Sequence, residues 1–219
     1  MKDINFFEHF YNSNGGDRLV RDITREINPD IWEKRCLIFG YGEKFLDNFE
    51  ATELYYAIPS GNEIYHWPKI RPFKTVVTDA DALPFPPDVF DDVIVIHYIE
   101  FAAKCLDVLR EIYRVLKPKG KLIIISANKM DFLEKNAKKL GMNDIISELS
   151  NMSFFVSKIF GVNRKMNFWP YRFSYTLNKY NEAIINVFPF MSDIVIISSE
   201  KTESAPEVVS SFSEQYEMS

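Results

Sequence analysis

The sequence predicts a doubly wound α/β fold, in which a mostly parallel sheet has helices on both faces. Five short apolar runs lack alternating polar residues, which is typical of strands buried on both faces. An amphipathic helix separates the last two runs, as in a βαβ unit. The runs are residues 36–39, 54–58, 75–77, 93–96 and 122–125. In such a sheet, ligands bind at the carboxyl ends of the strands.

Residues 1–34 are expected to form a helical segment ahead of the sheet. Apolar residues recur at helical spacing in two stretches, which the polar, glycine-containing residues 12–16 separate. Asp17 is expected to cap the second helix and Pro29 to end it.

The strongest helical pattern runs from Ala102 to Leu116, with Leu106, Leu109 and Ile112 among its apolar positions. Pro118 and Gly120 are expected to end it. Beyond it, the patterns predict helices near residues 131–140, 144–149 and 177–187 and strands near 154–159 and 194–198. We therefore assign residues 35–200 to one α/β domain. Residues 201–219 are rich in Ser and Glu without periodicity, so this tail is expected to be disordered.

Composition excludes several classes of protein. The 219 residues include only 8 glycines, which form neither a Walker phosphate loop nor a complete G-x-G-x-x-G. A net charge of −5 without a Lys/Arg-rich tract argues against a nucleic-acid partner. The apolar runs are too short to span a membrane and the N-terminus lacks a signal-peptide pattern, so a cytoplasmic location is expected. Cys36 and Cys105 have no nearby histidine, so neither a metal site nor a disulfide is expected.

Three stretches carry the argument about function. They read Thr-Asp-Ala-Asp-Ala-Leu-Pro-Phe-Pro at 78–86, Phe-Asp-Asp-Val-Ile-Val-Ile-His at 90–97 and Leu-Arg-Glu-Ile-Tyr-Arg-Val-Leu-Lys-Pro-Lys-Gly-Lys-Leu at 109–122. In this order they resemble the class I S-adenosylmethionine-dependent methyltransferases, specifically the small-molecule branch called type 11. The resemblance is continuous over residues 76–125. It implies a Rossmann-like sheet of seven strands, S-adenosylmethionine as cofactor, a small-molecule methyl acceptor, and N-terminal helices that cover the cofactor cleft.

The resemblance also implies roles for residues at the strand ends. Gly40, Tyr41 and Gly42 stand where the family's glycine loop approaches the methionine part of the cofactor. Asp79 stands where an aspartate accepts a hydrogen bond from the adenine amino group, and Ala80 would pack beside the base. The alternative for Asp79 is a loop-capping role.

His97 follows the fourth strand, where the family places residues that face the cofactor and the acceptor. It is a candidate general base or a group that orients the substrate, and a structural histidine is the alternative. Tyr98 and Glu100 occupy the same rim with the same two interpretations.

Two departures from the family pattern favour a second hypothesis. Lys44 occupies the position of the third loop glycine, and residues 57–60 lack the acidic residue that binds the ribose, for which Ser60 or Asn62 could substitute in part. A catalytically inactive methyltransferase-fold protein, with a binding or regulatory role, would fit both. Its cleft would be filled by Tyr41, Lys44 or residues 59–67.

Other aromatic and basic residues are candidates for the pocket. Tyr41, Tyr98, Trp169 and Tyr171 could line it, and Arg172 could hold an anionic acceptor. A nucleotide-binding oxidoreductase is a third hypothesis, which the missing third glycine of a dinucleotide fingerprint disfavours. The sequence specifies neither the acceptor nor the oligomeric state.

Overall fold

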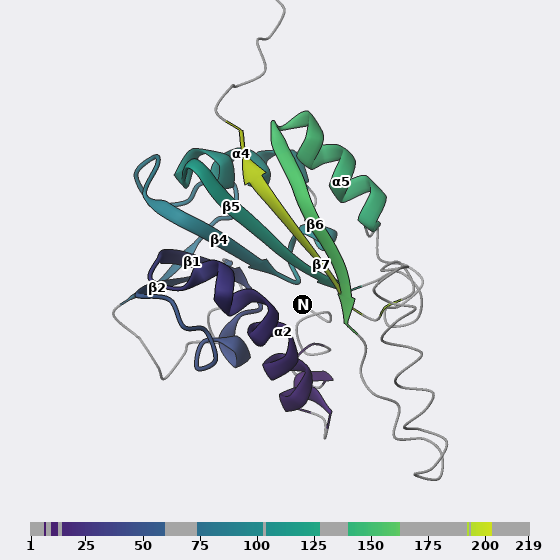
Figure 1. Ribbon diagram of the computed structural model, residues 1–219. Helices are drawn as coiled ribbons and strands as arrows, with labels where there is room; N and C mark the ends of the chain where they lie inside the picture. The colour runs from purple at the N-terminus through teal and green to yellow at the C-terminus, as the bar shows by residue number, and fades with distance from the viewer. Residues whose placement is uncertain are drawn as a thin grey trace, which may run out of the picture.

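A seven-stranded sheet with helices on both faces forms the centre of the computed structural model (Figure 1). The structure describes residues 7, 10–12, 15–59, 74–102, 104–127, 140–162, 192 and 194–202. The strands are β1 (Arg35–Gly40), β2 (Glu53–Pro59), β3 (Thr75–Thr78), β4 (Phe90–Ile96), β5 (Leu116–Ala127), β6 (Phe154–Val162) and β7 (Ile194–Lys201). Their spatial order is β3-β2-β1-β4-β5-β7-β6. This arrangement confirms the predicted fold class.

The centre of the sheet is the parallel pair β1 and β4, with Gly40 opposite Ile96 at the carboxyl ends. β2 and β3 add in parallel beside β1, and β5 adds in parallel beside β4. β7 lies antiparallel between β5 and β6. Because the strand order reverses between β1 and β4, a crevice for ligands is expected at their carboxyl ends.

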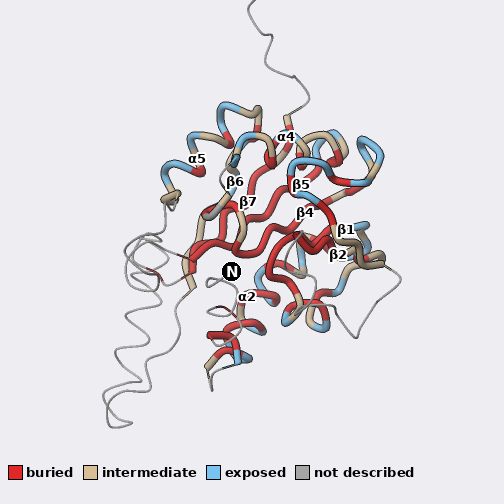
Figure 2. Tube along the Cα trace, turned by 180° about the vertical axis from the view of Figure 1, so that it is seen from behind, coloured by how far each residue is buried: buried red, intermediate tan, exposed pale blue. Residues whose placement is uncertain are grey.

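Helices cover the two faces of the sheet unequally (Figure 1). α2 (Gly16–Ile31) packs on one face, where Ile23 and Ile27 join Ile38 and Ile94 in one apolar core. α4 (Cys105–Val115) and α5 (Met142–Asn151) pack on the other face in a second core. Figure 2 shows buried residues throughout the central strands, as expected for strands covered on both sides.

Several expected helix boundaries differ from those in the structure. Pro29 lies inside α2, which continues to Ile31, because a proline near the last turn removes only one intrahelical N–H donor. Asp17 lies in the first turn without a side-chain cap, and Gly15 is the capping residue. α4 starts three residues later than predicted, and Leu116 begins β5.

The inward face of α4 also differs from the prediction at one position. Leu106 is 39% exposed, because the helix buries the stripe formed by Val108, Leu109, Ile112 and Val115. A short 3-10 helix, η3 (Ile99–Phe101), precedes α4 and follows β4 directly.

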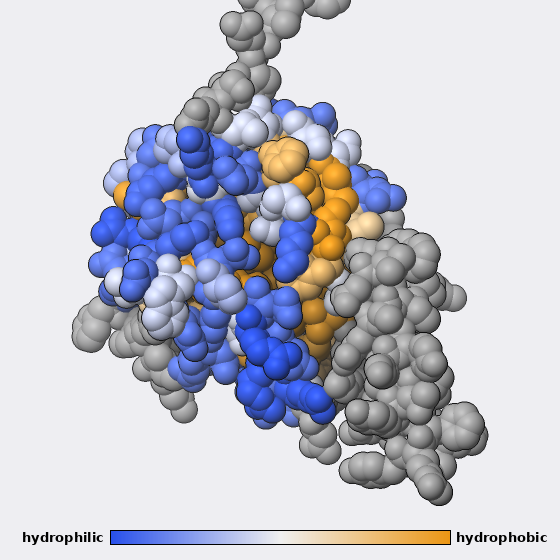
Figure 3. Space-filling view, in the orientation of Figure 1, coloured by the Kyte–Doolittle hydropathy of each residue, from blue (hydrophilic) through white to orange (hydrophobic). Residues whose placement is uncertain are grey.

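The carboxyl-terminal part of the sheet agrees with the patterns. α5, β6 and β7 occupy the predicted stretches, whereas the helices predicted at 131–140 and 177–187 lie mainly outside the described residues. β6 is an edge strand with Phe155 63% exposed, and Figure 3 shows an apolar band in this part of an otherwise polar face. No helix among the described residues is long and apolar enough to cross a bilayer.

The last residue of β7 is a buried lysine. The Lys201 ammonium donates to the carbonyl oxygens of Leu116 at 2.7 Å and Tyr113 at 2.8 Å, and it pairs with Asp88 at 3.0 Å. The same ammonium lies 4.4 Å from the centroid of the Tyr113 ring. Lys201 thus fastens β7 to the junction of α4 and β5, one residue beyond the expected domain boundary at 200.

Replacing Lys201 with Met is expected to lower the free energy of unfolding by about 2 kcal/mol, because two buried carbonyl groups lose their charged donor. Urea unfolding followed by circular dichroism measures this. The matched control is Lys158→Met on β6, where the side chain is 54% exposed and pairs with Glu26 only at 3.8 Å. Its effect should stay within about 0.5 kcal/mol, and equal effects in both variants would contradict the anchoring role.

Candidate functional site at the carboxyl ends of β1, β3 and β4

The chain turns sharply at Gly40, where β1 ends beside β4. Gly40 has a φ of +95°, and a Cβ atom there would lie 2.3 Å from the carbonyl oxygen of Ile96. Only glycine fits this backbone conformation and this close approach. The Tyr41 amide then donates to the same carbonyl at 2.8 Å. The loop after β1 is therefore bound to the end of β4.

The Tyr56 side chain holds this loop from β2. Its hydroxyl donates to the Gly40 carbonyl at 3.0 Å and accepts the Gly42 amide at 3.3 Å. Burial raises the pKa of the Tyr56 phenol, so the hydroxyl keeps its proton and remains a donor. Sequence reasoning missed this residue. A tyrosine in a strand buried on both faces was the available signal, since a buried hydroxyl requires a partner.

Tyr41 and Lys44, which follow Gly40 in the loop, lie in different environments. Tyr41 is 7% exposed, and its ring stacks on Tyr11 with centroids 5.9 Å apart. Lys44 is exposed on the short 3-10 helix η1 (Glu43–Phe45). Of the two, Tyr41 is the residue that packs among the buried aromatic side chains at the strand ends.

Asp79 follows β3 directly and is exposed. Its carboxylate makes no hydrogen bond or ion pair with any residue that the structure describes, whereas its carbonyl accepts bonds from Thr78 and the Ala82 amide. The backbone, and not the side chain, therefore closes this loop. Ala80 beside it is 9% exposed. The carboxylate remains available to a ligand.

Two charged residues of α4 clamp the loop that follows Asp79. The Arg114 guanidinium donates to the carbonyls of Phe85 at 2.7 Å and Leu83 at 2.9 Å, while Glu111 accepts the Leu83 amide at 2.9 Å. The two side chains also pair with each other, which lowers the pKa of Glu111. The Leu-Pro-Phe and Arg-Glu-x-x-Arg stretches of the sequence are thus one structural unit.

His97 stands at the end of β4 with a φ of +48°, a conformation that non-glycine residues seldom adopt. Its Nε2 atom lies 2.7 Å from the Tyr11 hydroxyl and its Nδ1 atom 3.1 Å from Glu100 Oε1. The Phe7 ring stacks on the imidazole with centroids 3.9 Å apart. The His97 side chain is fully buried. It is a buried link in a hydrogen-bonded chain from Tyr11 to Glu100.

The two other residues of this rim point to different neighbours. Glu100 is fully buried, and Oε1 accepts the Ala127 amide at the end of β5 at 3.1 Å. Its Oε2 atom has no hydrogen-bond partner in the described part of the chain. Tyr98 is half-buried against Phe39, with a pKa raised by burial and by the charges of Asp81 and Asp79. Tyr98 therefore belongs with the Asp79 loop, and Glu100 with His97.

Several sequence candidates lie outside the described residues: Ser60, Asn62, Trp169, Tyr171, Arg172 and most of the 59–67 loop. The end of β2 is described, and Pro59 pairs there with Thr78. No carboxylate is present at this strand end within the described part of the chain. Cys36 and Cys105 are free, and no cluster of metal-ligating side chains occurs among the described residues.

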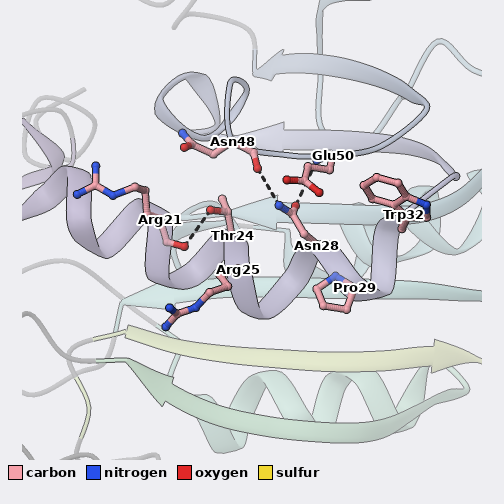
Figure 4. A pocket seen from close by; sticks show the side chains of 8 residues that line it. All are labelled: Arg21, Thr24, Arg25, Asn28, Pro29, Trp32, Asn48 and Glu50. Carbon is pink, nitrogen blue, oxygen red and sulfur yellow. Dashed lines mark hydrogen bonds between the residues drawn. The ribbon is translucent and has the colours of Figure 1, made fainter.

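A separate hollow of about 630 Å³ lies between α2 and the stretch before β2 (Figure 4). It is lined by Arg21, Thr24, Arg25, Asn28, Pro29, Trp32, Asn48 and Glu50. Asn28 crosses it, donating to the Asn48 carbonyl and accepting the Glu50 amide. The hollow contains none of the predicted cofactor residues. It is distinct from the strand ends where those residues gather.

Replacing Tyr56 with Phe is expected to lower the free energy of unfolding by about 1–3 kcal/mol, because the buried loop groups lose their partner. Chemical denaturation measures the change, and amide exchange at Gly42 should increase. Tyr55→Phe is the matched control on the same strand, since the Tyr55 hydroxyl bonds to no described residue. Similar losses in both variants would contradict the role of Tyr56.

Replacing Arg114 with Lys is expected to lower the free energy of unfolding by about 1–3 kcal/mol, because an ammonium cannot reproduce the planar bonds to two carbonyls and Glu111. Hydrogen exchange across 79–86 should rise at the same time. Arg110→Lys, on the exposed side of the same helix, is the control. Unchanged exchange in the Arg114 variant would show that the clamp does not order the loop.

Comparison with known proteins gives a consistent result. Residues 56–124 match the type 11 family model, described as a methyltransferase domain. A demethylmenaquinone methyltransferase from Chlamydia muridarum is 36% identical over 56 residues, which make up 26% of this chain and 24% of that protein. The matched segment thus spans about a quarter of the relative's length.

Solved structures resemble nearly the whole chain. An S-adenosylmethionine-dependent methyltransferase from Archaeoglobus fulgidus has a TM-score of 0.61 at 18% identity, over 84% of this chain and 94% of its own. One from Thermotoga maritima has a TM-score of 0.58 at 18% identity, over 90% and 99%. The [4+2]-cyclase SpnF has a TM-score of 0.55 at 16% identity, over 85% and 81%.

These structural similarities establish the fold. The family match lies in the segment from β2 to β5. The chain has the fold of the S-adenosylmethionine-dependent methyltransferases, and the resemblance of its central segment to their type 11 branch is confirmed.

Proposed function

We propose that the protein is a cytoplasmic S-adenosylmethionine-dependent methyltransferase that acts on a small-molecule acceptor. The observation that carries this proposal is the Asp79 carboxylate. It is exposed and unpaired among the described residues at the end of β3, inside the segment that matches the methyltransferase family. The clamp from α4 orders the loop that presents it.

The described residues offer more contacts to the adenine end of the cofactor than to its methionine end. Asp79 would accept the adenine amino group, with Ala80 beside the base and Tyr98 at its edge. The loop of Gly40, Tyr41 and Gly42 would face the methionine part. When bound, S-adenosylmethionine supplies an activated methyl group, so that positioning provides much of the rate acceleration.

The residues at the end of β4 would remove the proton of the acceptor. His97 is the candidate proton acceptor, and Glu100 fixes the imidazole through Nδ1. The aromatic rings of Phe7 and Tyr11 pack on His97, Tyr41 packs behind Phe7, and the His97 side chain is shielded from water. A proton acceptor at this position would serve an acceptor molecule that loses a proton as it is methylated.

A catalytically inactive binding or regulatory protein is the second candidate. Two observations favour it: the Tyr41 ring is packed against Tyr11, and the Gly42 amide is bonded to Tyr56 instead of being free for a ligand. The missing acidic residue at the end of β2 supports the same view, because a charged hydrogen bond to the ribose would be lost. The two candidates differ in whether methyl transfer takes place.

Isothermal titration with S-adenosylhomocysteine is the direct test, and the folded wild-type protein is expected to bind it. Asp79→Ala should weaken binding by about 10–150-fold, the equivalent of one charged hydrogen bond. Asp81→Ala is the matched control in the same loop, because its carboxylate already pairs with Lys104 at 3.5 Å. It should leave the affinity nearly unchanged.

Absence of binding at millimolar ligand would overturn the proposal. Equal losses in the two aspartate variants would remove Asp79 from the adenine site. Binding without transfer of a labelled methyl group to any small molecule of a metabolite extract would favour the inactive candidate.

A further inference from the structure

A tyrosine from the N-terminal segment occupies an aromatic slot at the junction of β1 and β4. The Tyr11 ring stacks on Tyr41 with centroids 5.9 Å apart and meets Phe45 edge-on at 5.2 Å. Its hydroxyl reaches His97 Nε2 at 2.7 Å. Tyr41 and Phe45 follow β1 and His97 follows β4, so these three walls of the slot belong to the α/β domain, whereas Tyr11 and its neighbours Phe7 and Phe10 precede α2.

The polar end of the slot is built to receive a hydroxyl group. Glu100 accepts from His97 Nδ1 and from the Ala127 amide, so Nε2 faces the slot as a hydrogen-bond acceptor. Burial, with Tyr41 and Glu100 nearby, raises the pKa of Tyr11, which therefore keeps its proton and acts as the donor. The imidazole plane is fixed on its other side by Phe7.

Two features of the slot indicate more than a packing role. His97 is held at a positive φ, a strained backbone conformation that is common at functional sites. Glu100 is fully buried, and its Oε2 atom has no hydrogen-bond partner among the residues that the structure describes. A proton arriving at His97 would create the opposite charge next to that carboxylate. The slot also lies where the strand order reverses.

We propose that the methyl acceptor is a phenol, which binds in this slot in place of the Tyr11 ring. The proposal rests on the proposed function and names its substrate class. Tyr11 itself is a phenol, and it shows which contacts the slot offers: an aromatic face from Tyr41, an aromatic edge from Phe45 and a hydrogen-bond acceptor at His97. Phenylalanine would fill the same volume without needing that acceptor.

The proton step balances within these residues. The phenolic O–H bond breaks, its proton passes to His97 Nε2, and the oxygen retains the electron pair as a phenolate. The imidazolium keeps its Nδ1–H bond to Glu100, which balances the new positive charge. The phenolate is the nucleophile that methyl transfer requires. In this scheme Tyr11 competes with the acceptor, and Glu100 is a positioning residue.

The experiment uses p-cresol, the free equivalent of a tyrosine side chain, and toluene, which lacks the hydroxyl. Tyr11→Ala opens the slot, and this variant is expected to bind p-cresol about tenfold tighter than toluene, measured by NMR titration without cofactor. Wild type should bind p-cresol more weakly than the variant, because Tyr11 competes. Equal affinities for the two probes would overturn the proposal, as would no binding of either.

The control removes the acceptor atom in the same background. Tyr11→Ala with His97→Asn retains a residue that tolerates positive φ but is too short to reach the probe. Its preference for p-cresol over toluene should disappear. If circular dichroism shows that the Tyr11→Ala variant is unfolded, Tyr11→Phe replaces it. That variant should bind p-cresol about threefold tighter than wild type, and an unchanged affinity would overturn the proposal.

A spectroscopic probe tests the proton step and the role of Glu100. p-Nitrophenol absorbs at longer wavelength when ionised, so its spectrum reports transfer of its proton to His97. At a pH where the free probe is mostly neutral, binding to Tyr11→Ala should produce the phenolate band. Adding Glu100→Gln should abolish the band, whereas a purely structural role would leave it. Its persistence would exclude Glu100 from the step.

The phenol-binding tests and the test of the proposed function can fail independently of each other. These measurements need no cofactor, whereas the cofactor titration needs no phenol. Loss of S-adenosylhomocysteine binding with a retained phenol preference would overturn the methyltransferase proposal alone. Cofactor binding without a phenol preference would overturn the acceptor class alone.

Discussion

The close contact between β1 and β4 at Gly40 and Ile96 is the constraint on which the other features of the site depend. It forces glycine at position 40, turns the chain onto the end of β4 and binds the Tyr41 amide to the Ile96 carbonyl. Tyr41 and His97 consequently emerge side by side at the point where the strand order reverses. Tyr56 then fixes the turn from the neighbouring strand. The slot around Tyr11 exists because this junction places Tyr41 and His97 next to each other.

The stretches that most resemble the methyltransferase family have a structural role, because they hold the loop after β3 in place. Glu111 and Arg114 hold the Leu83–Phe85 backbone, and this order leaves Asp79 exposed at the end of β3. A half-buried clamp that bonds to the backbone is worth more than a surface ion pair, because removing one partner leaves backbone groups unsatisfied. The stretches that resemble type 11 methyltransferases therefore support the loop at the end of β3 that carries Asp79.

The fold does not decide the reaction. One similar structure is a [4+2]-cyclase and others are S-adenosylmethionine-dependent methyltransferases, so the chemistry of this chain must be read from its own side chains. Those side chains contrast sharply. The end of β3 offers an open carboxylate, whereas the end of β4 is closed by Tyr11, Phe7 and Tyr41 around a histidine–glutamate pair.

The strands, the helical pattern of α4 and the place of Asp79 could be predicted from the sequence, because apolar runs and helical periodicity are local signals. A strand that is buried on both faces is recognisable without knowing which strand lies beside it. The sequence also predicted that His97 lies at a strand end, but not that it contacts Tyr11 and Glu100. The tertiary structure decided that Tyr11, 86 positions earlier, donates to His97, and that Arg114 reaches Leu83 across 31 positions. Hydrogen bonds between residues so distant leave no periodic signal, so only the packing of the sheet and its helices brings these groups together.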